Sequence, residues 1–236
     1  MPSQLAGLSA AILAGGLGTR LRSVVADRPK VLAPVAGKPY LAHLLEQLAR
    51  AGIRETTLLV GFAAEQVRSA FGSAHAGLSL NYSVEPEPLG TAGALRLALP
   101  LLHSETILLL NGDSYCDVDL PALLAFHRAR RGVATLTLAE VPDGSRFGRV
   151  TCDSDRRVER FEEKGVSAGP GWINAGVYLL NRDALKEIEP GRSVSLEREV
   201  LPRWVERGEV FGFPGSRRFI DIGTPESYAE AEAFFS

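Results

Sequence analysis

A glycine-rich loop followed by an arginine is the first feature of the chain that could do chemistry. Residues 15–20 read GGLGTR, directly after an apolar run. Glycines allow backbone N–H groups to surround an anion, and a threonine hydroxyl and an arginine guanidinium suit phosphate oxygens. The loop lacks the Walker A ending, and Leu21 stands where a dinucleotide-binding loop would close with glycine. A plain strand-to-helix turn is the alternative interpretation, which the adjoining Thr19-Arg20 pair disfavours.

A second cation, Lys30, follows ten residues after Arg20 in the run RPKVL. Pro29 stiffens the backbone before it, and the apolar residues after it would hold the lysine stem. A lone lysine on a loop is usually a solvated charge. Beside a phosphate-binding loop, however, Lys30 is a candidate second cation for a triphosphate.

Two carboxylates stand in positions that suit a ligand site. Asp113 comes directly after a fully apolar run and Gly112, so we expect it at the carboxyl end of a buried strand. Asp221 lies between two isoleucines, where a carboxylate needs a partner or a metal to offset desolvation. Carboxylates combined with phosphate oxygens suit Mg²⁺. A simple turn aspartate is the alternative for Asp113.

The elements that must position these residues alternate in the first half of the chain. Apolar runs predict strands at residues 9–14, 56–60, 78–84 and 106–110, and helical spacing predicts helices at residues 39–50, 63–71 and 91–102. This order indicates βαβ units around a parallel sheet with helices on both faces. Ligands of such sheets bind beyond the carboxyl ends of the strands.

The second half is less regular. We predict strands at residues 133–141, 149–152, 158–162 and 177–180, a short strand within 212–222, and helices at 196–207 and 225–235. Thr224 is the expected N-cap of the last helix, with Pro225 in its first position. No repeat or linker is apparent, so we expect one domain over residues 1–236.

Composition indicates an ordinary soluble protein. The 236 residues are 45% hydrophobic and 23% charged, with a formal net charge of -2 and no basic block that would indicate a nucleic-acid polymer as partner. The two cysteines form no CxxC pair, the N-terminus does not resemble a signal peptide, and no apolar run could span a membrane. We therefore expect a cytoplasmic protein without a membrane partner.

The loop and the lysine together resemble a known signature. LAGGLGTRL followed by RPKVLAPVAGKP is similar to the pattern GGxGTRxxPxTxxxPKxxxPxxxKP of the sugar nucleotidyltransferase family, although Ser23, Val24 and Val25 fill a place where many members carry proline. The resemblance covers nearly the whole chain. It implies an α/β fold, a Rossmann-like three-layer sandwich with a mostly parallel mixed central sheet, similar to GT-A folds. No hexapeptide repeat occurs, so we expect no β-helix domain.

The resemblance also implies roles for individual residues. Residues 9–113 would form the nucleotide-binding half and residues 114–236 the sugar-phosphate-binding half. The implied nucleotide-binding residues are Leu13, Ala14, Gly15, Gly16, Gly18, Thr19, Arg20, Lys30, Glu85, Pro88, Gly90, Thr91 and Asp113. The implied sugar-phosphate-binding residues are Gly112, Gly148, Glu163, Lys164 and Asn174. The implied catalytic residues are Arg20, Lys30 and Asp113, and the implied Mg²⁺ ligands are Asp113 and Asp221.

The implied reaction is an in-line displacement. A sugar-phosphate oxygen would attack the α-phosphorus of a nucleoside triphosphate, and pyrophosphate would leave on the opposite side. Such a transfer depends on positioning and charge neutralisation, so we expect neither a protein nucleophile nor a covalent intermediate. By resemblance, nucleotide-sugar synthesis of this kind serves polysaccharides such as an S-layer or capsule glycan.

The nucleobase and the sugar are predicted from three segments. EPEPLGTAG, residues 85–93, resembles the base loop of mannose-1-phosphate and heptose-1-phosphate guanylyltransferases, in which Glu85 or Glu87 could accept hydrogen bonds from guanine. INAGVYLL and FIDIGTPESY are most similar to the heptose enzymes. We therefore expect GTP and D-glycero-α-D-manno-heptose 1-phosphate as substrates and GDP-heptose as product.

Four alternatives stay open from the sequence. A mannose-1-phosphate guanylyltransferase and an N-acetylmuramic acid 1-phosphate uridylyltransferase share the EPL run, and uridine also offers an N–H to a carboxylate. A non-catalytic nucleotide-sugar sensor would keep the fold but lose the charged residues, which are present here. A dinucleotide-dependent oxidoreductase is disfavoured by Leu21. A homodimer is expected only by analogy with similar short enzymes.

Overall fold

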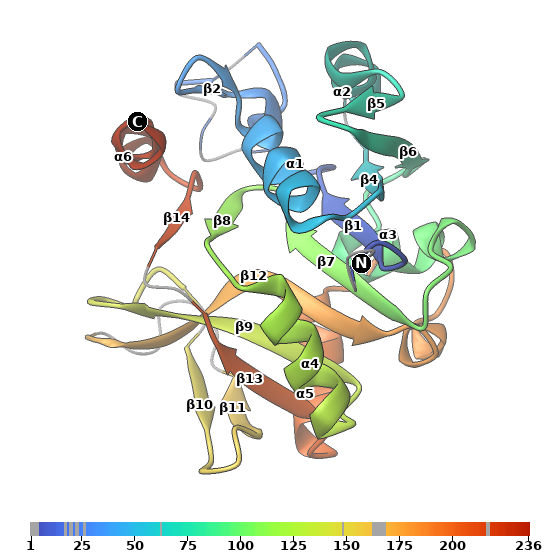
Figure 1. Ribbon diagram of the computed structural model, residues 1–236, viewed down its shortest axis with the longest axis vertical. Coiled ribbons are helices and arrows are strands. Elements are labelled where there is room, and N and C mark those ends of the chain that lie inside the picture. The colour runs from blue at the N-terminus through green and yellow to red at the C-terminus, as the bar shows by residue number, and fades with distance from the viewer. Residues whose placement is uncertain are drawn as a thin grey trace.

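The computed structural model describes residues 5–16, 18, 21, 24, 25, 27–61, 63–147, 149–161, 169–215 and 218–236. Its centre is an 8-stranded sheet with the order β13-β9-β12-β7-β1-β4-β6-β5 (Figure 1). These strands are β1 (Ser9–Leu13), β4 (Glu55–Val60), β5 (Ala74–His75), β6 (Leu78–Val84), β7 (Thr106–Asn111), β9 (Ala134–Val141), β12 (Gly171–Asn181) and β13 (Val210–Pro214). The four strands predicted in the first half are all present.

The sheet is mixed, as the family resemblance implies, whereas the alternation of elements alone predicted a parallel sheet. Strand β1 pairs in parallel with β4 and β7, β4 pairs in parallel with β6, and β9 pairs in parallel with β13. Strand β12 is antiparallel to both of its neighbours, β7 and β9, and β5 is antiparallel to β6. Strands β4 and β6 therefore lie on one side of β1, and β7 and β12 lie on the other. This change of direction leaves a crevice beyond the carboxyl ends of β1, β4 and β7.

Helices cover both faces of the sheet and give three layers (Figure 1). They are α1 (Tyr40–Ala51), α2 (Ala64–Phe71), α3 (Gly90–Ala98), α4 (Leu120–Arg130), α5 (Leu201–Glu206) and α6 (Pro225–Phe235). The alternation of β7 shows why two cores form: Leu108 and Leu110 pack with α1, α2 and α4, whereas Ile107 and Leu109 pack with α3 and α5.

Short elements complete the structure. They are the 3₁₀ turns η2 (Lys30–Leu32), η3 (Leu99–Leu101) and η4 (Ala184–Glu187), the π-helical turn η5 (Leu196–Val200), and the strands β2 (Pro34–Val35), β3 (Lys38–Pro39), β8 (Ser114–Cys116), β10 (Val150–Cys152), β11 (Val158–Phe161) and β14 (Phe219–Asp221). The predicted helix at 91–102 is α3 followed by η3, and that at 196–207 is η5 followed by α5. The segment 212–222 contributes to two strands, β13 and β14, rather than one.

Strand β12 is much longer than its predicted segment 177–180. Its pairing with β9 shifts register between Asn174 and Tyr178, and Gly176 has a φ of 75° at that point. A bulge at a left-handed glycine interrupts the alternation on which the prediction relied. The structure therefore brings Asn174 and Tyr178 onto one strand, where the Asn174 side-chain amide donates to the Tyr178 hydroxyl at 2.8 Å.

The last helix begins as predicted. The Thr224 side chain accepts from Ser227 N, and the Ser227 side chain accepts in return from Thr224 N, which completes a capping box. Because β14 ends three residues before this cap, the fixed start of α6 also fixes the backbone that carries Asp221.

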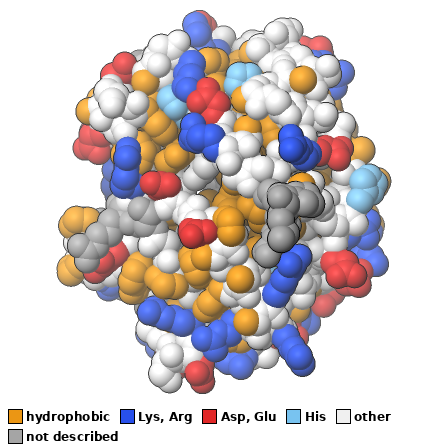
Figure 2. Space-filling view, viewed as in Figure 1, with side chains coloured by type: hydrophobic (Ala, Val, Ile, Leu, Met, Phe, Trp, Pro, Cys, Tyr) orange, Lys and Arg blue, Asp and Glu red, His pale blue; other side chains and the backbone are white. Residues whose placement is uncertain are grey.

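The surface agrees with the balanced composition. On the face shown in Figure 2, Lys and Arg side chains lie interspersed with Asp and Glu around the rim, and hydrophobic side chains gather nearer the centre. Within the described ranges, we find no helix with both the length and the apolar character needed to cross a membrane.

Gly112 is the tightest point between β1 and the end of β7. Its N–H donates to Leu13 O at 2.9 Å, and a Cβ on Gly112 would lie 2.3 Å from that same oxygen. Since backbone cannot move aside as a flexible side chain can, residue 112 must be glycine to keep the two strand ends together.

We predict that Gly112→Ala lowers the free energy of unfolding by about 1–3 kcal/mol because it forces β1 and β7 apart. Urea denaturation measures this loss. Gly16→Ala is the matched control, because a Cβ there meets no atom within 4 Å. Equal denaturation midpoints for the two variants would contradict the close approach.

Candidate active site

A cavity of about 670 Å³ lies beyond the carboxyl ends of the parallel strands. Residues at or just after four strand ends line it: Leu13 of β1, Gly61 after β4, Glu85 after β6 and Asn111 of β7. Its volume is in the range of small-molecule sites, and its position is that expected for an α/β sheet. The described residues that line it are Leu13, Gly15, Gly16, Gly18, Lys30, Val31, Gly61, Glu85, Pro86, Glu87, Pro88, Gly90, Thr91, Ala94, Asn111, Gly112, Asp113, Glu197 and Gly223.

Lys30 and Asp113 form an ion pair on the cavity wall. The Lys30 Nζ lies 2.7 Å from Asp113 Oδ2, and the Lys30 side chain is only 10% exposed whereas that of Asp113 is 41% exposed. Gly18 packs on the lysine stem, since a Cβ there would lie 2.9 Å from the Lys30 Cβ. The glycine loop, the turn η2 and the end of β7 are thereby joined in one site.

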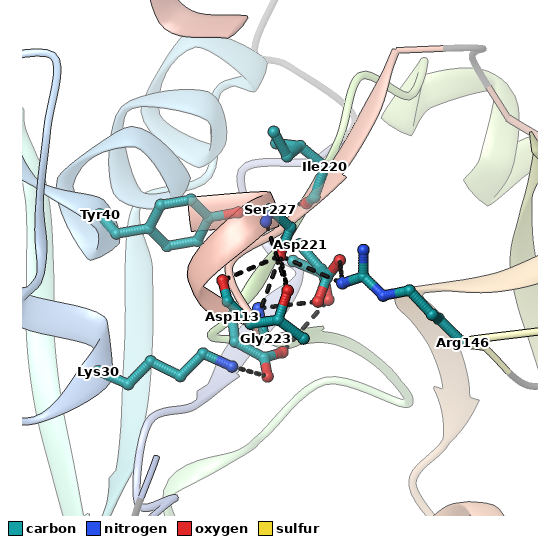
Figure 3. A network of polar contacts seen from close by, with 10 residues as sticks. Lys30, Tyr40, Asp113, Arg146, Ile220, Asp221, Gly223 and Ser227 are labelled. Atoms are coloured by element: carbon teal, nitrogen blue, oxygen red, sulfur yellow. Dashed lines mark hydrogen bonds and ion pairs between the residues drawn. The ribbon is translucent and has the colours of Figure 1, made fainter. Parts of the chain in front are cut away.

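Asp221 lies next to Asp113 because β14 pairs with β8. In this pair Ser114 stands opposite Asp221, and Ile222 N donates to Asp113 O at 2.9 Å. Figure 3 shows the two carboxylates close together, with Lys30 and Arg146 approaching them from opposite sides. Arg146 Nη2 lies 3.2 Å from Asp221 Oδ1, and Gly223 N donates to the other oxygen at 2.8 Å.

Tyr40 supports the carboxylate pair from behind. Its hydroxyl donates to Ile220 O at 3.4 Å, which ties α1 to β14 (Figure 3). Complete burial raises the pKa of Tyr40 well above its ordinary value, and the nearby charges of Asp113 and Asp221 raise it further. The hydroxyl therefore stays protonated and available as a donor to the strand that carries Asp221.

The donor set at this position suits a hard divalent cation. Asp113, which lines the cavity, and Asp221, which lies next to it, each attract a cationic side chain in the structure. Among the residues that the structure describes, no group of three or more His, Cys, Asp or Glu side chains could hold a metal ion. A pair of carboxylates completed by substrate oxygens and water is the arrangement that Mg²⁺ uses at phosphate sites.

Glu85 brings a second acidic group to the cavity. Its Oε2 accepts from Leu89 N at 2.8 Å, and its Oε1 lies 2.7 Å from the place of a Cβ on Gly15. Burial raises the pKa of the Glu85 carboxyl, and the bond from Leu89 opposes that rise. The carboxylate is thus a fixed acceptor beside the glycine loop, whereas Glu87 is exposed.

Glu197 is a third acidic group, and it comes from the second half of the chain. Its Oε2 accepts from Thr91 Oγ1 at 2.8 Å and from Ser195 Oγ at 3.3 Å, and its Oε1 accepts from the Tyr178 hydroxyl at 3.4 Å. Asn111 also contacts this hydroxyl through its Nδ2 at 3.5 Å. A connected polar wall therefore joins α3, β7, β12 and η5.

The structure brings most of the predicted site residues together. Those that line the cavity are Leu13, Gly15, Gly16, Gly18, Lys30, Glu85, Pro88, Gly90, Thr91, Gly112 and Asp113. Ala14, Asn174 and Asp221 are described but are not among the lining residues, and the Asn174 amide contacts Tyr178 and Gly176 N. Thr19, Arg20, Gly148, Glu163 and Lys164 lie outside the described residues, so their roles stay predictions.

Sequence reasoning missed Asn111, Arg146 and Glu197. Asn111 directly precedes Gly112 and Asp113, so its place at the strand end could have been inferred. Arg146 lies in an irregular loop, and Glu197 falls within a predicted helix where a glutamate is normally solvated. Their partners Asp221 and Thr91 are distant in sequence, and no local pattern reports such pairs.

Comparison with known proteins agrees with this geometry. Residues 9–236 match the family model described as nucleotidyl transferase. The chain is 37% identical over 225 residues to D-glycero-alpha-D-manno-heptose 1-phosphate guanylyltransferase of Aneurinibacillus thermoaerophilus, covering 95% of this chain and 97% of that one. It is 38% identical over 229 residues to mannose-1-phosphate guanylyltransferase of Mycobacterium tuberculosis, covering 96% of this chain but only 64% of that relative's length.

A solved structure shares the fold. The crystal structure of HddC from Yersinia pseudotuberculosis complexed with GMP-PN superposes with a TM-score of 0.84 and 31% identity, and the match covers 97% of this chain and 100% of that one. The expected family and fold class are therefore confirmed. The chain belongs to the nucleotidyl transferase family, with its cavity at the crevice that this fold leaves beyond the parallel strands.

Proposed function

We propose that this protein is a sugar-1-phosphate guanylyltransferase that joins GTP to D-glycero-α-D-manno-heptose 1-phosphate. The observation that carries the proposal is the Lys30–Asp113 pair in a cavity between the glycine loop and the loop of Glu85. Similarity to relatives named as guanylyltransferases over nearly the whole chain supports the reaction class. A homodimer and a cytoplasmic location stay predictions.

The proposed reaction forms one bond and breaks one. An oxygen of the sugar phosphate bonds to the α-phosphorus of GTP, and the bond from that phosphorus to the bridging oxygen breaks, so pyrophosphate leaves with its electron pair. Both reactants are anions, and the nearly buried Lys30 ammonium offsets part of their repulsion. By the resemblance of their motifs to those of the family, Arg20 and Lys164 would add further positive charge.

We further propose that Asp113 and Asp221 hold Mg²⁺. The two adjacent carboxylates and their cationic neighbours support a site that favours positive charge. When bound, the ion would supply additional positive charge to the phosphate oxygens. Gly223 N and the β8–β14 pairing would keep Asp221 oriented toward the site whether or not the ion is present.

The choice of guanine rests on Glu85. This carboxylate accepts a hydrogen bond from Leu89 N and lies against the glycine loop. In the described part of the structure it forms no ion pair, so it suits the N1–H and N2–H of guanine. The choice of heptose rests on the resemblance of INAGVYLL and FIDIGTPESY, because relatives named for heptose and for mannose are almost equally identical.

We expect pyrophosphate release with Mg²⁺ from GTP plus the heptose 1-phosphate and not from UTP, CTP, ATP or dTTP. The assay also includes mannose 1-phosphate and N-acetylmuramic acid 1-phosphate. Turnover of GTP with mannose 1-phosphate alone would keep the class and change the sugar. Turnover of UTP with the muramic sugar would overturn the assignment of the base. Tight nucleotide binding without turnover of any pair would support a non-catalytic sensor.

Asp113→Asn should lower the rate of pyrophosphate release about 100-fold or more, because it removes a carboxylate from the metal site and leaves Lys30 without its anionic partner. Asp117→Asn is the matched control, since Asp117 is exposed and follows the short strand β8. The Mg²⁺ dependence of GTP binding by calorimetry is the second readout. Unchanged Mg²⁺ dependence in Asp113→Asn would refute the metal assignment.

Glu85→Gln should lower kcat/KM for GTP about 10- to 100-fold. The substitution replaces one acceptor oxygen by an NH2 donor, so the two N–H groups of guanine can no longer each face an acceptor oxygen. The comparison is Glu87→Gln, which changes the exposed acid two residues away. Binding of GTP and of inosine triphosphate, which lacks the 2-amino group, separates the two N–H contacts. A loss confined to Glu87→Gln would transfer the role to that residue.

A further inference from the structure

Arg146 is the cation that faces Asp221. Its Nη2 lies 3.2 Å from Asp221 Oδ1 and donates to Ser227 Oγ, also at 3.2 Å (Figure 3). Its guanidinium stands 5.4 Å from the centre of the Phe147 ring, and that ring packs edge-on against Phe219 with the ring centres 5.4 Å apart. Phe219 and Asp221 belong to the same strand, β14, so the strand that carries the carboxylate also holds the arginine beside it.

The two carboxylates are balanced by two positive side chains. Asp113 accepts from Lys30 at 2.7 Å, and Asp221 Oδ1 accepts from Arg146 at 3.2 Å. The other oxygen of Asp221 accepts from Gly223 N at 2.8 Å, so both oxygens of this carboxylate accept hydrogen bonds from the protein. A divalent cation added here without an anion would leave an excess of positive charge, which is unfavourable.

The two cations differ in how firmly they are held. The Lys30 side chain is only 10% exposed and its stem lies under Gly18, whereas 45% of the Arg146 side chain is exposed. An ion pair that is open to solvent is weak, because water and salt screen its charges and a long side chain loses freedom when it forms. Arg146 is therefore the cation that an incoming divalent ion displaces more readily.

We propose that Arg146 competes with the divalent cation for Asp221 and thereby lowers the affinity of the nucleotide-free protein for the ion. The inference rests on the proposed function, because it concerns the proposed Mg²⁺ ligands Asp113 and Asp221. A nucleoside triphosphate brings the negative charge that the ion and the displaced guanidinium both require, so the ion binds preferentially together with the nucleotide. Arg146 is thus a positioning residue that acts on the ion through Asp221.

The test uses Mn²⁺, which favours the same oxygen ligands as Mg²⁺ and whose unbound fraction is measured by electron paramagnetic resonance. With the nucleotide-free protein, Arg146→Gln should lower the Kd for Mn²⁺ about 3- to 10-fold, because a guanidinium no longer competes with the ion. Arg146→Lys retains the charge and should stay close to wild type. The matched control is Arg207→Gln, since Arg207 is 44% exposed and pairs with Glu187 and Glu209, which do not line the cavity.

A second background shows whether the effect passes through Asp221. The double variant Arg146→Gln/Asp221→Asn should bind Mn²⁺ no more tightly than Asp221→Asn alone, because the contested oxygen has lost its charge. Thermal midpoints of all variants are measured alongside. An arginine that merely fastens its loop to Ser227 and Asp221 would lower the midpoint when replaced, but its loss would not tighten the binding of Mn²⁺.

Two results would overturn the inference. One is a Kd for Mn²⁺ in Arg146→Gln that is equal to or weaker than that of wild type, and the other is a gain in affinity that persists in the Asp221→Asn background. The proposed function is judged separately by pyrophosphate release. Wild-type protein that releases no pyrophosphate from any substrate pair, while Arg146→Gln still binds Mn²⁺ more tightly, would refute the guanylyltransferase and leave the competition at Asp221 intact.

Discussion

The ion pair between Lys30 and Asp113 is the interaction on which the site depends. A lysine that is only 10% exposed requires an anionic partner, because desolvation of its charge is otherwise unfavourable. Asp113 is that partner, and Gly112 holds it beside β1 through the bond to Leu13. The lysine stem in turn lies under Gly18 of the glycine loop. One pair of charges therefore joins the first loop of the fold to the strand end that carries the principal carboxylate.

The remaining charges of the cavity divide it by chemistry. Lys30 provides positive charge near Asp113, whereas Glu85 and Glu197 are acidic groups held by neutral donors. Neither glutamate can face a phosphate without repulsion, so the phosphates must lie nearer the lysine and the N–H or hydroxyl donors of the ligands nearer the acids. Substrate orientation thus follows from the distribution of charge, before any detailed contact with a ligand is considered.

Sequence patterns predicted the parallel half of the fold well, because buried strands such as β7 are continuous apolar runs and helices such as α1 end at glycine. They failed where tertiary contacts decide. Helix α4 was not predicted, although Asp119 caps it, because its apolar residues form no clear stripe. Strand β12 was predicted short because Gly176 breaks its alternation. Glu197 could not be recognised because its partner Thr91 lies 106 residues away.

The segment EPEPLGTAG, residues 85–93, illustrates how one motif can combine two functions. Glu85 lines the cavity, but Gly90 and Gly93 are required by the backbone of residues 192–194, and the Thr91 hydroxyl is committed to Leu196 and Glu197. Its second half therefore also reports how the wall of Glu197 is built. In this chain the GTAG part is constrained by its packing on the segment before η5. Evidence for guanine must consequently come from the side chain of Glu85 and its neighbours rather than from the length of the matching motif.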